Sequence, residues 1–361
     1  QDNAGALSHN TGIRKEKYPE PHTLEKTKLE EFTEADIHLD DANLSILPSD
    51  GYYLEYRLDG TCNKPEYGVD NGKFHFQEGT AQKKFRISFS PIGNPANSGP
   101  LYLNLYVPED HYFKLLNITM ESGNIEDMQA NAEKAEFTIE YGNLSLEGFT
   151  GGDFTVSSES GNIKFGEITC DNLSISAEYG DFSGDTVSAS GRADISLESG
   201  NMDVSKLTAD TLSVRSQYGN CEIGSVSFKD GTFSLESGNL YVSGLTANSL
   251  SVENLYGSCG IDGISIKKGI FSMESGNLTL GHAALGNTSA TSEYGDVKLE
   301  LSDQISDYSY DLETEYGTIN VGGDAIEGDE DGRIFYRKQD GKQKKNISIF
   351  CESGNVTIQK D

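Results

Sequence analysis

A nineteen-residue repeat is the feature that most limits how this chain can fold. Copies of Glu-Ser-Gly-Asn begin at Glu121, Glu159, Glu198, Glu236, Glu274 and Glu352. Tyr-Gly motifs lie at Tyr141, Tyr179, Tyr218, Tyr256, Tyr294 and Tyr316, so Ser and Tyr largely alternate before the glycine. A fixed period over many copies indicates stacked supersecondary units. We therefore expect a repeat architecture whose unit is nineteen residues, doubled to thirty-eight by the alternation.

The apolar positions within one unit indicate what is stacked. They recur with a spacing of two, separated by breaks, as at Ile163, Phe165, Ile168, Leu173 and Ile175. Alternation at period two turns one face of a short strand inward, and the breaks between pairs indicate corners. The sequence thus predicts an all-β fold, a parallel β-helix or solenoid with about nineteen residues per coil. A β-propeller with thirty-eight-residue blades is the rival fold.

Cysteine, glycine and asparagine also recur at fixed places in the unit. Cys221 and Cys259 fall at an inward position, so we expect them in the core, two coils apart and without a disulfide. The repeated glycine is expected at a corner. The Asn or Asp that follows it is expected to form a ladder of hydrogen bonds from coil to coil. The preceding Glu column is harder to explain, because stacked like charges repel; Gln217 and Leu255 interrupt it.

The first third of the chain lacks the repeat. Residues 1–30 are polar and without period, and are predicted to be a linker or tail. Residues 31–115 are predicted to be irregular β structure that caps the solenoid of residues 116–361. All eight prolines lie at or before Pro108, which marks the boundary. Strands are expected at 37–39, 44–46, 52–58, 73–76, 85–89 and 101–107.

The repeat is interrupted near its end by a charged excursion at residues 323–345. Its first half carries five acidic residues and its second half carries six basic ones, among them Arg333, Arg337 and Lys338. We expect a hairpin that turns near Asp340 and Gly341, with its two halves neutralising each other. The alternative is a free basic patch that contacts an anionic envelope polymer.

Composition and motifs exclude several functions. A formal net charge of −30 argues against binding to nucleic acid. No stretch is long and apolar enough to span a membrane, and because the chain opens with Gln1, a leader or anchor is expected upstream. The six histidines are scattered, and no phosphate-binding, dinucleotide-binding or nucleophile motif occurs. We therefore expect no cofactor, no metal site and no catalytic residue.

Three segments resemble the bacterial “putative adhesin” domain of unknown function. Residues 32–47 resemble its opening strand pair, 101–108 its next segment and 353–358 its closing turn, with serial Ser-Gly-Asp/Asn turns between them. The resemblance implies a right-handed β-solenoid of a surface protein, which agrees with the usual hand of parallel connections.

Two functions remain open from the sequence. The first is a noncatalytic cell-surface structural or adhesive module, extracellular on a bacterium, that contacts a glycan, a surface protein or an envelope polymer. The second is a carbohydrate-active β-helix enzyme with carboxylates on one face. In the first, a column of tyrosines is expected along the solenoid, and its purely structural role is to cover the glycine corner. Its members are Tyr141, Tyr179, Tyr218, Tyr256 and Tyr294. Their alternative role is to stack on sugar rings.

Overall fold

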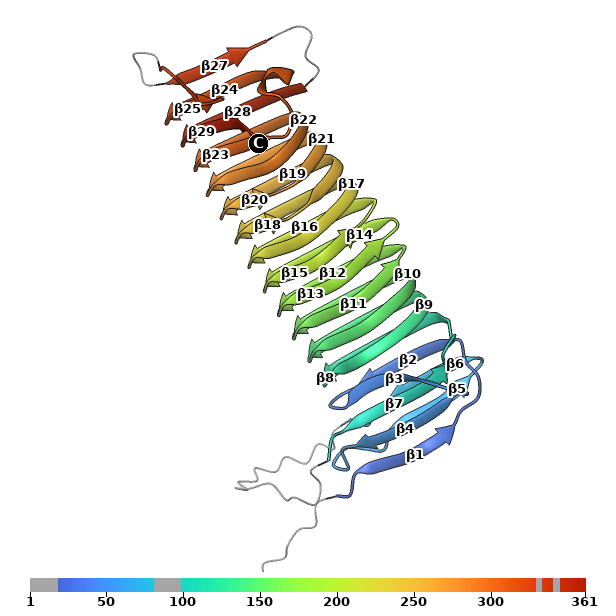
Figure 1. Ribbon diagram of the computed structural model, residues 1–361. Coiled ribbons are helices and arrows are strands. Elements are labelled where there is room, and N and C mark those ends of the chain that lie inside the picture. Colours follow the sequence, from blue (N-terminus) through green and yellow to red (C-terminus); the bar gives the residue numbers. More distant parts are fainter. Residues whose placement is uncertain (1–18, 81–98, 329–332, 340–344) are drawn as a thin grey trace, which may run out of the picture.

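The computed structural model describes residues 19–80, 99–328, 333–339 and 345–361, and it shows a long β-solenoid (Figure 1). The repeating part runs from β8 to β23. Its strands are β8 (Phe113–Ser122), β9 (Ile125–Tyr141), β10 (Leu144–Ser160), β11 (Ile163–Cys170), β12 (Asn172–Tyr179), β13 (Phe182–Ala189), β14 (Arg192–Ser199), β15 (Met202–Thr208), β16 (Thr211–Tyr218), β17 (Cys221–Ser237), β18 (Leu240–Val242), β19 (Leu245–Tyr256), β20 (Cys259–Ile261), β21 (Ile264–Ser275), β22 (Leu278–Tyr294) and β23 (Val297–Leu301).

Parallel pairing at an offset of nineteen residues confirms the size of the coil. Ile163 of β11 pairs with Leu144 on one side, nineteen residues earlier, and with Phe182 on the other, nineteen later. Cys221 pairs with Leu240, which pairs with Cys259, so the two cysteines lie two coils apart, and neither forms a disulfide. Every pairing between β8 and β23 is parallel, and this excludes the propeller.

The predicted inward positions form the core. The five side chains at 163, 165, 168, 173 and 175 are each no more than 2% exposed. Corners fall where adjacent residues both point outward, at 166–167, at 171–172 and again at 178–181. Phe154 contacts Phe137 and Phe165 with ring centroids 5.3 and 5.6 Å apart, so rings on successive coils pack along the axis.

The glycine corner holds successive coils close together. A Cβ placed on Gly219 would lie 2.0 Å from the carbonyl oxygen of Gly200, and its φ of +141° also disfavours other residues. Beside it runs the predicted ladder: the Asn143 N–H donates to Asn124 Oδ1 at 2.9 Å, and Asn162 N–H donates to Asn143 Oδ1 at 2.9 Å. The ladder prediction is confirmed, and the donor at each of these steps is the backbone of the next coil.

The N-terminal cap confirms the expected irregular β structure. Its strands are β1 (His22–Lys28), β2 (Glu34–Leu39), β3 (Asn43–Ser49), β4 (Tyr53–Leu58), β5 (Glu66–Asp70), β6 (Lys73–Gln77) and β7 (Tyr102–Pro108). β1 lies in the stretch assigned to a tail, so that assignment was wrong for these residues; β1 is held by antiparallel pairing with β4. The strand expected at 85–89 lies outside the described residues.

The first coil of the chain, β2–β3, is not the outermost coil. β2 pairs with β8 on one side and with β6 on the other. β3 pairs with β7, and its ladder pairing with β9 is confined to Leu44 and Ile125. Beyond them, β5 pairs antiparallel with β6, and β4 pairs antiparallel with β7. Antiparallel strands therefore cover this end of the solenoid.

At the C-terminal end, too, the terminal coil lies between two other coils. It contains the short 3₁₀ helix η2 (Ile305–Asp307) and the strands β24 (Tyr308–Tyr316), β25 (Ile319–Val321), β26 (Asp324–Ile326), β27 (Ile334–Lys338), β28 (Lys345–Ser353) and β29 (Val356–Lys360). β28 pairs with β22 on one side and with β24 on the other, so the last coil is inserted between two earlier ones. β29 lies likewise between β23 and β25. Antiparallel β26 and β27 are outermost.

Candidate functional site

Tyrosine and serine alternate along one edge of the solenoid. Tyr179 pairs with Ser160 on one side and with Ser199 on the other, and Ser199 pairs in turn with Tyr218. The complete column in spatial order is Ser122, Tyr141, Ser160, Tyr179, Ser199, Tyr218, Ser237, Tyr256, Ser275, Tyr294, Ser353 and Tyr316. We call this column the tyrosine edge. The structure thus brings together all five tyrosines singled out from the sequence and adds Tyr316.

The inserted last coil restores the alternation where the sequence breaks it. Along the chain, Tyr294 is followed by Tyr316 and only then by Ser353. In space, Ser353 lies between the two tyrosines, pairing with Tyr294 on one side and Tyr316 on the other. The alternation is therefore a property of the folded surface, since simple duplication of a thirty-eight-residue unit would not place Ser353 there.

The rings of the tyrosine edge are open to solvent. Their exposure is 54–57% at the five sequence-predicted tyrosines and 72% at Tyr316. Tyr256 shows how one ring lies, because its hydroxyl donates a 3.0 Å hydrogen bond to the Glu274 carboxylate of the next coil. That bond raises the pKa of the Tyr256 phenol. This ring therefore leans toward the serine coil beside it, as predicted, yet more than half of its surface stays free.

A column of acidic residues runs beside the tyrosine edge, one residue earlier in each coil. In spatial order it reads Glu121, Glu140, Glu159, Glu178, Glu198, Gln217, Glu236, Leu255, Glu274, Glu293, Glu352 and Glu315. We call it the acidic column. At its N-terminal end, the nearby Asp40 carboxylate raises the pKa of Glu121. Negative charges therefore crowd one another on this part of the surface.

The basic residues of the excursion find acidic partners outside it. Arg333 contacts Glu315 at 2.5 Å, and Arg337 contacts Asp311 at 2.9 Å. Both acids lie on β24, against which β27 packs antiparallel. The acidic half of the excursion was predicted to neutralise these bases, but Arg333 and Arg337 pair with acids of β24 instead. The turn predicted near residues 340–341 lies outside the described residues. Lys338 ends β27, and the described part of the chain offers it no ion pair.

One known protein family matches this sequence. The sequence pattern of one family, Toastrack DUF4097, matches twice, over residues 32–196 and 191–359, which together span most of the chain. The chain belongs to the Toastrack DUF4097 family. No curated protein matches it. The resemblance seen in the sequence, to a bacterial domain family of unknown function, is thereby confirmed.

Three solved structures are similar to this Toastrack chain at low identity. One, from Clostridium sporogenes, is described as a “putative cell adhesion protein”; it shares 10% identity over 95% of this chain and 100% of its own, with a TM-score of 0.22. A “putative lipid binding protein” from Parabacteroides distasonis shares 15% identity over 79% of this chain and 95% of its own, with a TM-score of 0.35. A “putative adhesin” from Bacteroides fragilis shares 13% identity over 95% and 97%, with a TM-score of 0.24.

A second feature of this Toastrack chain, not anticipated from the sequence, is a cleft where the cap meets the solenoid. Because β3 leaves β9 after Leu44, a space of about 390 Å³ opens between them. Glu109, Glu147 and Glu167 line it, and the strand register shifts on both sides of Leu146. The sequence spacing here is regular, so only the pairing register reveals the irregularity.

His111 also lines the cleft. It is 8% exposed and packed edge-on against Phe113 with ring centroids 4.3 Å apart, and its Nε2 has no hydrogen-bond partner among the described residues. Burial lowers its pKa, because an apolar surrounding favours the uncharged imidazole over the charged one. Its Nδ1 lies 3.2 Å from the Tyr52 hydroxyl. These contacts anchor the ring in the aromatic cluster of the cap.

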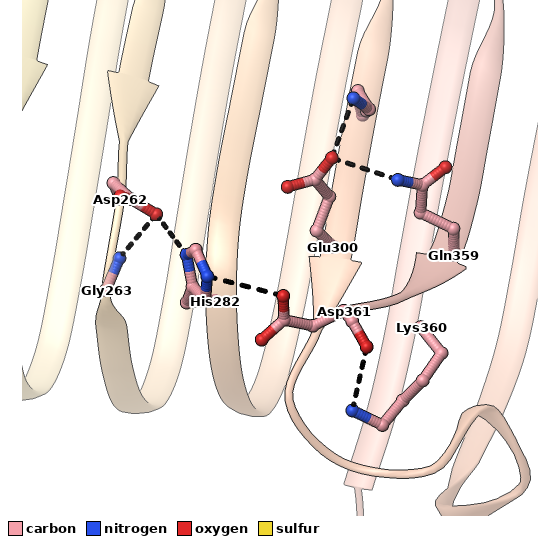
Figure 2. A network of polar contacts seen from close by, with 8 residues as sticks. Asp262, Gly263, His282, Glu300, Gln359, Lys360 and Asp361 are labelled. Atoms are coloured by element: carbon pink, nitrogen blue, oxygen red, sulfur yellow. Dashed lines mark hydrogen bonds and ion pairs between the residues drawn. The ribbon is translucent and has the colours of Figure 1, made fainter.

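A polar network fixes the last residue of the chain to the solenoid (Figure 2). His282 lies between two carboxylates, with Nδ1 2.6 Å from Asp262 and Nε2 3.3 Å from Asp361. The contact with Asp262 raises the pKa of the His282 imidazole. The backbone of His282 has a φ of +44°, which is uncommon for a residue other than glycine. This network holds Asp361 against an earlier coil.

Two kinds of feature are absent from the described residues. Within residues 19–80, 99–328, 333–339 and 345–361, no three His, Cys, Asp or Glu side chains gather closely enough to hold a metal ion. Over the same ranges there is no helix with the length and apolar character needed to cross a bilayer.

Proposed function

We propose that this protein is a noncatalytic binding module of the bacterial cell surface, which contacts an extended partner through the tyrosine edge. The observation that carries the proposal is the position of Ser353 between Tyr294 and Tyr316. The chain reaches this arrangement by inserting its last coil, and the result is an unbroken alternation along the whole edge.

The exposure of the rings supports a role in contact rather than in folding. A side chain contributes to stability mainly through the apolar surface it removes from water, and these rings leave more than half of theirs in solvent. Every second coil folds with serine at the same corner, as at Ser160 and Ser199. Tyrosine combines an apolar ring with a hydrogen-bonding hydroxyl and is enriched where proteins bind partners.

Repetition also suits binding more than catalysis. A row of equivalent contacts lets a long partner bind through many weak interactions at once, which raises the overall affinity by avidity. A surface adhesive module needs this property, and the six tyrosines of the edge supply it.

The test replaces three central rings with the residue that the alternate coils already carry. The variant Tyr179→Ser, Tyr218→Ser and Tyr256→Ser is compared with Tyr241→Ser, which removes a ring that is 46% exposed on β18, away from the edge. Binding to a panel of glycans, envelope polymers and bacterial surface proteins is measured together with thermal stability. We expect the triple variant to keep its stability and to lose at least about tenfold in affinity for its ligand, while Tyr241→Ser keeps both. Equal binding by the two variants would overturn the proposal.

The cleft at the cap favours one second candidate. A carbohydrate-active enzyme uses two carboxyl groups, one as acid and one as base or nucleophile, and three glutamates line this cleft at a break in the repeat. The discriminating experiment is a screen for new reducing ends released from polysaccharides, with Glu147→Gln and Glu167→Gln as matched variants. Hydrolysis that both variants abolish would establish the enzyme.

A further inference from the structure

The spacing of the tyrosine edge restricts the kind of chain that can lie along it. Neighbouring strands lie about 4.7–4.9 Å apart. The tyrosines are two strands apart, so they repeat about every 9.4–9.8 Å, which is twice that spacing. A ligand that contacts each ring in the same way needs a repeat of similar length. This requirement applies to any partner that uses the whole edge from Tyr141 to Tyr316.

Regular polypeptide conformations differ sharply in how they meet this requirement. A polyproline II helix turns once every three residues and rises about 3.1 Å per residue, so one turn spans about 9.3 Å. An extended strand repeats its face every 6.6–6.8 Å, about two-thirds of the tyrosine spacing. Two turns of an α-helix span about 10.8 Å, and this mismatch accumulates to about 5–7 Å over the five steps of the edge. The polyproline II helix alone stays in register, to within about 2.5 Å over the same five steps.

The chemistry of the edge agrees with this geometry. A polyproline II chain has no internal hydrogen bonds, so its carbonyl groups remain available to donors such as the exposed tyrosine hydroxyls. Proline rings pack against aromatic side chains in the known grooves that recognise this conformation. A serine lies between each pair of tyrosines, as Ser199 lies between Tyr179 and Tyr218, so the rings of the edge alternate with a small hydroxyl side chain.

The acidic column sets the charge of the partner. Ten of its twelve positions are Glu, in a chain with a formal net charge of −30, so an anionic chain would be repelled. The protein itself already places a cation here: Arg333 contacts Glu315 at 2.5 Å, on the same coil as Tyr316. A cationic side chain beside a carboxylate and a tyrosine ring gains both a charge–charge and a cation–π interaction.

We infer that the partner of the tyrosine edge is a cationic chain in the polyproline II conformation, with one basic side chain for every three residues. This inference rests on the proposed function and specifies the ligand of the same surface. Each triplet would place its basic group over the acidic column and its proline rings against one tyrosine and the adjacent serine.

The experiment uses the full chain and labelled synthetic peptides. The probe is (Pro-Pro-Lys)n, with as many triplets as the edge has tyrosines. Its controls are (Pro-Pro-Glu)n, which reverses the charge, (Pro-Lys)n, which keeps the conformation but puts the charges out of register, and an oligolysine of equal charge. A neutral linear glycan tests whether the edge binds a different kind of polymer. The variants are Tyr179→Ser/Tyr218→Ser/Tyr256→Ser, Glu178→Gln/Glu198→Gln/Glu236→Gln and the off-edge control Tyr241→Ser.

We expect (Pro-Pro-Lys)n to bind at least about tenfold more tightly than oligolysine, because its conformation is already fixed. The tyrosine variant should remove this preference, and the glutamine variant should weaken the dependence of binding on salt. Equal affinity for oligolysine, unchanged binding by the tyrosine variant, or binding of (Pro-Pro-Glu)n would overturn the inference. If only the glycan binds, and does so through the tyrosines, this inference fails while the proposed function stands. If no ligand binds in a tyrosine-dependent manner, both fail.

Discussion

The interior of the solenoid and its two ends follow different rules of chain order. In the interior, each coil lies between the coil that precedes it in sequence and the one that follows, as β11 does between β10 and β13. At the ends this order is broken. The first coil, β2–β3, and the last, β28–β29, are each enclosed by strands from nearer the middle of the chain (Figure 1).

The difference teaches how a repeat protein can protect the two ends of its stack of coils. The outermost coil of a simple solenoid is paired on one side only, so it has few contacts and frays. Insertion gives the terminal coil two neighbours. The strands left outermost are antiparallel, such as β27 on β24, so the end does not continue the parallel pattern that another chain could extend.

The largest expected effect comes from removing the inserted coil. Deletion of residues 345–361 removes five side chains with no more than 2% exposure, at Ile347, Ile349, Cys351, Val356 and Ile358. Each such burial contributes about 1.5–3 kcal/mol. β24 would also lose β28, its parallel partner and, within the described residues, the one strand that joins it to the solenoid. We expect the strands β24 to β27 to lose hydrogen-exchange protection together, and the melting temperature to fall.

Deletion of residues 1–28 is the matched change at the other end. It removes β1, the outermost strand of the cap, most of whose residues are exposed. We expect the described strands β2 to β29 to keep their exchange protection. Equal loss of stability in the two deletions would contradict the idea that insertion is what secures the termini.

A smaller effect is expected from alanine at a glycine corner, and it should differ between interior and end. At Gly219 a Cβ would lie 2.0 Å from the backbone oxygen of Gly200 on the preceding coil, so Gly219→Ala requires the coils to separate. We expect a loss of about 2–4 kcal/mol in the free energy of unfolding, at the upper range for single substitutions.

Gly323, in the turn between β25 and β26, is the end-of-chain control. Its φ is +93°, but among the described residues no atom beyond its two chain neighbours lies within 4 Å of the added Cβ. Gly323→Ala should therefore cost only the conformational strain, about 1–2 kcal/mol. Chemical denaturation of both variants measures the difference, and a larger cost at Gly323 would mean that contact between coils is not what fixes glycine at the corner.

The interior could be predicted from sequence because one period encodes it. Alternating apolar residues, the repeated glycine and the Asn ladder each state the same nineteen-residue coil, and a single unit such as 159–177 contains all of them. The tyrosine column followed from the same period. Its exposure did not, because the period gives the position of a side chain but not how far its ring lies from the neighbouring coil.

The order of the coils at the two ends could not be predicted, because a periodic pattern does not indicate the order in which coils stack. Two irregularities in the sequence do coincide with the inserted last coil. Twenty-two residues separate Tyr294 from Tyr316, and two Tyr motifs follow each other before Ser353. Read as a broken alternation, they could have indicated that the last coil is inserted. The cleft left no such mark, since the bulge near Leu146 arises from a shift in pairing at constant repeat length.

The smallest expected effect is a dependence on pH with opposite signs at the two ends. In the N-terminal cap, Glu78 is 2% exposed and accepts a hydrogen bond from the Asp40 N–H at 2.8 Å. Burial raises its pKa above the ordinary value of 4.5. At the C-terminal end, Asp303 accepts hydrogen bonds from Lys345 Nζ at 2.6 Å and from the Tyr308 hydroxyl at 2.8 Å. The bond from Lys345 lowers its pKa below the ordinary value of 3.8.

The signs follow from which state binds the proton more tightly. The folded cap holds the Glu78 proton more tightly than the unfolded chain does, so this contribution is complete below pH 4.5 and is lost as the pH rises through the folded pKa. The folded C-terminal end holds the Asp303 proton less tightly. Its contribution is present above pH 3.8 and is lost as the pH falls through the lowered value. Raising the pH therefore weakens the cap, whereas lowering it weakens the inserted coil.

Two isosteric variants separate these contributions. Relative to the unmodified protein, Glu78→Gln should stabilise the cap at about pH 7, by on the order of 1 kcal/mol, with a smaller gain at about pH 4. Asp303→Asn should destabilise the C-terminal end at about pH 7 and lose this effect toward pH 2–3, by about the same linkage argument. Exchange protection of the amides at Asp40 and in β28 reports the two ends separately. A shift of stability in the same direction by both variants at neutral pH would contradict this prediction. It would mean that the buried carboxyl in the cap and the ion-paired carboxyl beside the inserted coil do not differ in how their charge affects stability.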